Sequence, residues 1–119
     1  MIIGVVGPCG AGKSSVASGL KSHGYQIRHI AQEHSYVPDM WRRLTNPDIL
    51  IFLDVSYDNT IFRRKLDWTH AEYMDQLYRL RHARQHADLY IDTNFLVLEE
   101  VLNTIESFIQ TFPSPSDNK

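Results

Sequence analysis

The stretch Gly7-Pro8-Cys9-Gly10-Ala11-Gly12-Lys13-Ser14-Ser15 decides how the rest of the chain is organised. It follows an apolar, largely β-branched run at residues 2–6 and opens into residues 16–21, which are predicted to be helical. A run that is apolar on both faces is typical of a buried central strand in a parallel sheet. The sequence therefore predicts a strand, a glycine-rich loop and a helix in succession, which indicates an α/β protein.

The loop has the spacing G-x-x-x-x-G-K-[ST], which is the pattern of a phosphate-binding loop between a strand and a helix. Glycines allow the backbone to wrap closely around a polyphosphate, and backbone N–H groups at a helix N-terminus attract its negative charge. Lys13 is expected to reach the β- and γ-phosphates, and Ser14 to ligate Mg²⁺. The predicted nucleotide-binding residues of the loop are Gly7, Cys9, Gly10, Ala11, Gly12, Lys13, Ser14 and Ser15.

The composition indicates one small domain with neither a nucleic-acid nor a membrane partner. The chain has 119 residues and a formal net charge of −2, so its composition gives no basic footprint for nucleic acid. No apolar run approaches the roughly 20 residues that span a membrane. The single cysteine, Cys9, cannot form an internal disulfide, which favours a cytoplasmic setting. We expect one domain over residues 1–112 and a disordered tail over residues 113–119.

Apolar periodicity predicts strands that alternate with helices along the whole chain. The predicted strands cover residues 2–6, 25–30, 49–55 and 89–92. The predicted helices cover residues 13–22, 39–44, 56–65, 70–86 and 96–112. Ser56 or Asp58 is the expected cap of the third helix, and Thr69 with Glu72 the capping box of the fourth. The alternation predicts a three-layer α/β/α fold with a small parallel sheet, about four strands in the order 2-1-3-4.

Three features of the chain carry a resemblance to a known family. The first is the loop at residues 7–15, and the second is residues 47–55 (PDILIFLDV), followed by a helix that ends in Arg63-Arg64. The third is residues 87–94 (ADLYIDTN). Together they resemble the P-loop kinases of the nucleoside and nucleotide kinase-like group, which have the P-loop nucleoside triphosphate hydrolase fold. The match covers most of residues 1–30 and 46–112.

The resemblance implies that the protein binds ATP with Mg²⁺. In related kinases, arginines of the lid stack on the adenine or bind the phosphates, which makes Arg63 and Arg64 candidate catalytic residues together with Lys13. Asn94 follows the last predicted strand, where the adenine would lie in these kinases. The chain lacks the Asn-Lys-x-Asp pattern by which GTPases recognise guanine, so ATP is favoured over GTP.

The metal also needs a nearby acidic group, and two candidates stay open. Glu33 follows the second predicted strand and would lie near the loop if that strand is next to the first. Asp54 ends the third predicted strand and superficially fits the position of a magnesium-organising aspartate. Either carboxylate is otherwise an ordinary surface group, with Asp54 capping the next helix. Glu33 is also a candidate general base toward an acceptor hydroxyl.

The region between the second and third predicted strands departs from the family pattern. These kinases carry their acceptor-binding helices there, whereas only residues 31–46 are available here, and the acceptor region is reduced to residues 32–36 (QEHSY). We expect a compact Mg-ATP-dependent phosphotransferase that acts on a small molecule of unknown identity. The alternative is a nucleotide-binding or weakly hydrolysing regulatory module without kinase activity. An oligomer or a protein partner that completes the site stays open.

Two patterns in the fourth predicted helix have competing interpretations. Arg79 could face the nucleotide, but an ion pair with Asp75, four residues earlier, is favoured. His82 and His86 have the i, i+4 spacing that can chelate a metal from one helix face. No Glu or Cys nearby in the sequence completes a ligand set for them, so a solvated helix face is favoured.

Overall fold

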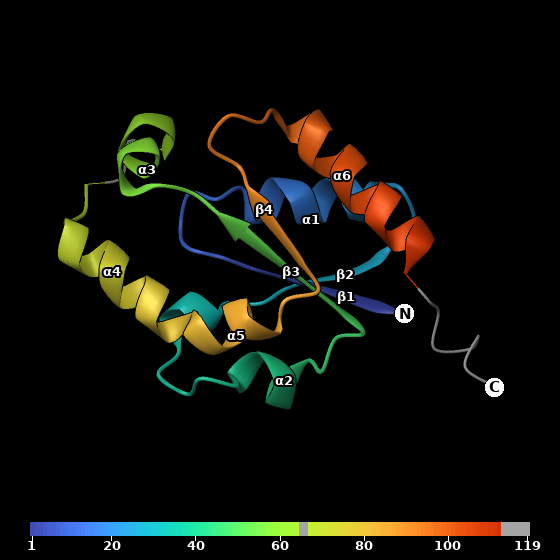
Figure 1. Cartoon of the computed structure of the whole chain (residues 1–119), viewed down its shortest axis with the longest axis horizontal. Helices are drawn as coiled ribbons and strands as arrows, with labels where there is room; N and C mark the ends of the chain where they lie inside the picture. The colour runs from blue at the N-terminus through green and yellow to red at the C-terminus, as the bar shows by residue number, and fades with distance from the viewer. Residues whose placement is uncertain (65–66, 113–119) are drawn as a thin grey trace.

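The computed structural model describes residues 1–64 and 67–112, and a parallel β-sheet lies at its centre (Figure 1). The strands are β1 (Ile2–Val6), β2 (Gln26–His29), β3 (Ile49–Asp54) and β4 (Leu89–Asp92). The helices are α1 (Lys13–Ser22), η1 (Gln32–His34), α2 (Met40–Leu44), α3 (Tyr57–Arg64), α4 (His70–Arg79), α5 (Arg81–His86) and α6 (Leu98–Thr111). The strand order is β2-β1-β3-β4, and all three pairings are parallel. The predicted tail at residues 113–119 lies outside the described residues.

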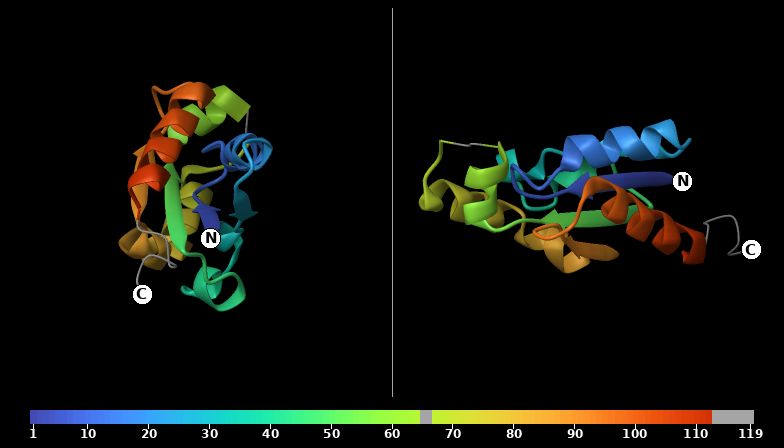
Figure 2. Two further views of the ribbon diagram at one scale, coloured as in Figure 1. Left: turned by 90° about the vertical axis from the view of Figure 1, so that its right-hand side faces the viewer. Right: turned by 90° about the horizontal axis from the view of Figure 1, so that it is seen from above.

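One face of the sheet is covered by α1 and α6 (Figure 2). Helix α6 buries Val101, Ile105 and Ile109, which are spaced by four residues and so share one side of the helix. They pack in the same cluster as Val16 and Leu20 of α1 and the inward-facing residues of β1 and β3. This larger core fixes α1, and therefore the loop that precedes it, against the sheet.

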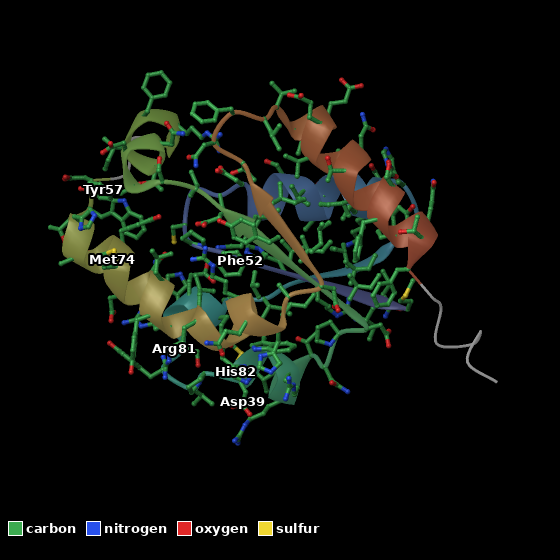
Figure 3. The ribbon with its side chains drawn as sticks, viewed as in Figure 1. Asp39, Phe52, Tyr57, Met74, Arg81 and His82 are labelled. Atoms are coloured by element: carbon green, nitrogen blue, oxygen red, sulfur yellow. The ribbon has the colours of Figure 1, made fainter. Side chains whose placement is uncertain are left out.

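The opposite face carries a smaller core, formed with α2 and α5. Trp41 of α2 and Ala83 of α5 pack with Leu50 and Phe52 of β3. Figure 3 shows Phe52 between the sheet and α5, and the completely buried Phe52 ring stacks on Tyr90 of β4. With helices on both faces, the structure confirms the predicted three-layer fold, the parallel sheet and its strand order.

The prediction of one continuous helix over residues 70–86 is wrong, because the chain breaks at Leu80 into α4 and α5. The N–H of Leu80 donates to the carbonyls of both Gln76 and Leu77, at 3.0 and 3.2 Å, which tightens the last turn of α4. The Leu80 side chain is completely buried in the smaller core. The break therefore lets α5 follow the sheet while α4 continues toward α3 (Figure 1).

The other predicted elements are present, with ends that differ by one or two residues. The capping box at the start of α4 is confirmed, since the N–H of Glu72 donates to the Thr69 hydroxyl at 3.1 Å and the Glu72 carboxylate accepts from the Thr69 N–H. Ser56 rather than Asp58 caps α3, because its hydroxyl accepts from the N–H of Asn59 at 3.3 Å. Local capping chemistry thus fixes where these helices start.

Candidate functional site

The loop after β1 lies at the carboxyl-terminal edge of the sheet, where β1 is flanked by β2 and β3. Gly7 is required by close packing, because a Cβ at this position would lie 2.1 Å from the carbonyl oxygen of Leu53 in β3. Gly12 has φ +95°, in the left-handed region that favours glycine, and α1 begins directly after it with no side-chain cap. The N–H groups in the first turn of α1 have no intrahelical partner and are available to an anion.

Lys13 and Glu33 form an ion pair beside the loop that is almost completely buried. The two residues are 6% and 3% exposed, and the Lys13 Nζ donates to the Glu33 Oε2 at 2.5 Å. The Lys13 Nζ also donates to the carbonyl oxygen of Gly7. Because β2 pairs with β1, Glu33 lies beside the loop, as expected from that strand order. Each charge depends on the other, since a buried charge without a partner is very unfavourable.

The short helix η1 holds Glu33 in place through its neighbour Gln32. The Gln32 side chain is completely buried, donating from Nε2 to the carbonyl of Val37 at 2.9 Å and accepting at Oε1 from the N–H of Trp41 at 2.9 Å. These bonds fold residues 32–41 back on themselves. This role of Gln32 is not predictable from the sequence, because a glutamine in a polar segment gives no signal that its amide is buried.

Arg79 of α4 supports η1 from the other side. The favoured ion pair with Asp75 is present, with an Nη2–Oδ2 distance of 2.5 Å. The same guanidinium donates from Nη1 to the carbonyl oxygen of Glu33 at 3.1 Å, and it lies 4.2 Å from the ring centroid of Tyr36. Arg79 therefore fixes the backbone of η1 against α4, a contact that helical spacing alone does not predict.

A pocket of about 140 Å³ lies beside the loop and Glu33. Its lining residues are Cys9, Gly10, Gly12, Lys13, Ser14, His29 and Glu33. Partial burial, with the nearby Lys13 ammonium, holds the pKa of His29 below its usual range, so this ring is neutral at neutral pH. The pocket combines an ammonium group, backbone amides, a serine hydroxyl and a carboxylate. These groups match the chemistry of a phosphate with a divalent cation.

A second pocket, of about 160 Å³, adjoins the first at Gly12, which lines both. Its lining residues are Ala11, Gly12, Ser15, Val16, Arg63, Thr93, Leu96, Leu98 and Val101. Arg63 of α3 donates from Nη1 to the Thr93 hydroxyl at 3.3 Å and from Nη2 to the Thr93 carbonyl. The structure therefore brings Arg63 to the loop, whereas the side chain of Arg64 lies outside the described residues. This pocket combines apolar side chains with a serine, a threonine and one guanidinium.

Asp54 and Asn94, two further predicted site residues, line neither of these pockets. The Asp54 carboxylate accepts from the N–H of Val55 at 2.9 Å and from the hydroxyl of Tyr90. Burial and this hydrogen bond raise the pKa of Tyr90 to about 12. The Asn94 side chain accepts from the N–H of Ser56 at 2.9 Å and so ties the end of β4 to the start of α3. Both side chains are thus engaged in contacts within the fold.

Comparison of the sequence with known protein families finds no family that matches the chain. Comparison with curated proteins finds no relative of significant similarity. Within residues 1–64 and 67–112, no helix has the length and apolar character needed to cross a membrane. The function of the site must therefore be inferred from its geometry.

Replacing Glu33 with glutamine would leave the Lys13 ammonium buried beside a neutral group. We expect Glu33→Gln to lower the free energy of unfolding by about 3–5 kcal/mol, because removing one partner of a buried ion pair strands the other charge. Urea denaturation at neutral pH measures the change. Glu106→Gln is a matched control, since Glu106 pairs with the exposed His23 at 2.7 Å, and it should change stability by less than about 0.5 kcal/mol. Equal effects of the two substitutions would contradict the structural role of the buried pair.

Proposed function

We propose that the protein binds ATP with Mg²⁺ on the loop Gly7–Ser15 and transfers the terminal phosphoryl group to a small acceptor. The observation that carries the proposal is the arrangement of the loop itself. Strand β1 runs into a loop fixed by Gly7 and Gly12, the uncapped start of α1 follows at once, and Lys13 is held at its centre. This combination of a helix N-terminus with a lysine suits a bound polyphosphate.

The triphosphate would occupy the pocket beside Glu33. Its oxygens would take hydrogen bonds from the loop amides, and the Lys13 ammonium would exchange the Gly7 carbonyl and Glu33 for the β- and γ-phosphates. Ser14 is exposed in the first turn of α1, where its hydroxyl is a suitable ligand for Mg²⁺. The same exchange would release the Glu33 carboxylate toward the metal, and Glu33 and Ser14 line the same pocket.

The base and ribose would occupy the second, more apolar pocket. Because Gly12 lines both pockets, one extended ligand would reach from the first to the second across the start of α1. Arg63 lies at the edge of the second pocket and is held in place by Thr93. Its guanidinium suits stacking on a base, which agrees with the role that the resemblance to P-loop kinases implies for a lid arginine. The absence of a guanine-recognition motif from the sequence favours ATP.

Phosphoryl transfer requires charge stabilisation around the γ-phosphate more than covalent chemistry from the protein. In this proposal Lys13 neutralises the developing charge, and the carboxylate of Glu33 organises Mg²⁺ or accepts the proton of the acceptor hydroxyl. The buried position of Glu33 beside the loop supports this role over Asp54, whose carboxylate is already bonded to Val55 and Tyr90.

Removing the ammonium of Lys13 should abolish most of the nucleotide affinity. Lys13→Met keeps an unbranched apolar stem but loses charge-assisted hydrogen bonds of about 1.5–3 kcal/mol each, so we expect at least tenfold weaker binding of Mg-ATP. Isothermal titration calorimetry measures the affinity. Lys21→Met is the matched control, because Lys21 is exposed near the other end of α1, and it should bind like the unmodified protein. Unchanged affinity in a folded Lys13→Met protein would overturn the proposed binding mode.

A nucleotide-binding regulatory module without kinase activity is the second candidate. The structure of residues 31–46 favours this candidate, because the segment forms only η1 and the five-residue α2. Two of its side chains, Gln32 and Trp41, are buried in the fold. Little of the segment is left to bind an acceptor. In this case ATP would bind at the loop, and its slow hydrolysis or its binding alone would be the functional event.

An acceptor screen separates the two candidates. If the protein is a phosphotransferase, at least one nucleoside, nucleotide or small alcohol should raise ATP consumption clearly above the rate without acceptor, in a coupled assay for ADP. The increase should be lost in Lys13→Met. A negative screen on a protein whose ATP binding has been measured would contradict the kinase proposal and leave the regulatory module.

A further inference from the structure

Three potential metal ligands converge beside the loop: Cys9, Glu33 and His34. The Cys9 Sγ, the carboxylate of Glu33 and a ring nitrogen of His34 all lie within 4.8 Å of one another. The Cys9 Sγ is 4.0 Å from the His34 Nε2, which is 3.9 Å from the Glu33 Oε2. Ligand atoms around a tetrahedral zinc ion, with bonds of about 2.0–2.3 Å, are about 3.3–3.8 Å apart. The two separations that involve His34 therefore exceed this spacing by only a few tenths of an ångström, whereas Cys9 and Glu33, at up to 4.8 Å, would have to approach by about 1 Å to hold such an ion.

The sulfur is held in position by a buried glutamine that the proposed nucleotide chemistry does not use. Gln76 of α4 accepts at Oε1 from the N–H of Cys9 at 3.0 Å and donates from Nε2 to the Cys9 Sγ at 3.2 Å. Both contacts come from one amide, so they fix the loop backbone and its sulfur together. A donated hydrogen bond stabilises a thiolate, and partners of this kind orient the ligands of metal sites.

Glu33 provides a second, independent indication of a ligand. Its Oε2 is bonded to Lys13, but its Oε1 is buried and has no hydrogen-bond partner among the described residues. A buried carboxylate oxygen without a partner is unfavourable, and such a group in a native structure often marks a bound water or ion. The other oxygen, Oε2, lies 3.9 Å from the His34 Nε2, so a cation bound between Cys9 and His34 would lie next to this carboxylate.

We propose that Cys9, Glu33 and His34 bind a thiophilic divalent cation of the Zn²⁺ type. A thiolate, an imidazole and a carboxylate suit zinc and related ions and discriminate against Mg²⁺, which prefers oxygen ligands alone. Binding displaces the proton of the Cys9 thiol to solvent. The thiolate and Glu33 then supply two negative charges, which the ion shares with the Lys13 ammonium, so the site keeps a net charge of +1. Three protein ligands leave a fourth position for water or another ligand.

The ion would connect two segments that are distant in sequence. Cys9 belongs to the loop after β1, and His34 to η1 after β2. A metal bond between them would cross-link the loop to η1 at the mouth of the pocket that Cys9 and Glu33 both line. The site is thus positioned to control the conformation of the loop, whether or not the protein transfers phosphate.

Cobalt titration of the reduced, full-length protein without nucleotide tests the site. Co²⁺ should bind one equivalent with a thiolate-to-cobalt charge-transfer absorption band, and Zn²⁺ should displace it, since zinc binds such sites more tightly than cobalt. Excess Mg²⁺ should not. Cys9→Ser should lose the band, and His34→Ala should bind Co²⁺ at least about tenfold more weakly. Circular dichroism establishes that each variant is folded, and His34 has an exposed side chain whose removal leaves the core intact.

The histidine pair of α5 supplies the matched control. His82 accepts at Nδ1 from the indole N–H of Trp41 at 3.1 Å, and Figure 3 shows it near α2. The His86 ring stacks on His82 with centroids 4.1 Å apart. Because His86 is not part of the cluster of Cys9, Glu33 and His34, His86→Ala should leave the thiolate-to-cobalt band unchanged. Absence of the charge-transfer band in the unmodified protein, or equal Co²⁺ affinity of His34→Ala and the unmodified protein, would overturn the proposal. Neither result depends on whether the loop binds ATP.

Discussion

The buried ion pair of Lys13 and Glu33 is the contact on which the rest of the site depends. It joins the first residue of α1 to η1, and so it connects the segments that follow β1 and β2. Lys13 is 6% exposed and Glu33 is 3% exposed, and either charge buried without the other would be strongly destabilising. The fold must therefore bring the two side chains together. The sheet places β2 beside β1, and Gln32 and Arg79 hold η1 so that the carboxylate meets the ammonium.

The charges of the same pair would determine how the proposed ligands bind. While Glu33 neutralises Lys13, the loop carries little excess positive charge. A triphosphate offers Lys13 a stronger set of acceptors and would leave Glu33 for Mg²⁺, whereas a thiophilic cation would use Glu33 with Cys9 and His34. In both proposals the Glu33 carboxylate binds a cation, which is Mg²⁺ in one and a thiophilic ion in the other. In the proposed binding mode, the two pockets that share Gly12 would hold the phosphates and the base of one nucleotide.

Much of this architecture is predictable from local sequence chemistry. The order of helices and strands is predicted by the apolar runs, the glycine loop and the Thr69–Glu72 capping box. The alternation of these elements indicates the parallel sheet and its strand order. The break at Leu80 was not predictable, because helical periodicity continues through it and only packing against Phe52 and its neighbours requires the turn. The amide of Gln76 on Cys9 and the guanidinium of Arg79 on η1 were missed for a related reason. The first contact joins residues that are 67 positions apart in the sequence, and the second joins residues 46 positions apart. No local pattern encodes such contacts.

In the proposed function, the amides of the loop bind the triphosphate together with Lys13. Proton–nitrogen correlation spectra of the labelled protein, titrated with Mg²⁺ and a non-hydrolysable ATP analogue, test it most directly. We expect saturable shifts that are largest at the amides of Gly10, Gly12, Lys13 and Ser14, with smaller shifts at Glu33 as Lys13 leaves it. Saturable shifts confined to other parts of the chain, or no shifts at these amides, would contradict it.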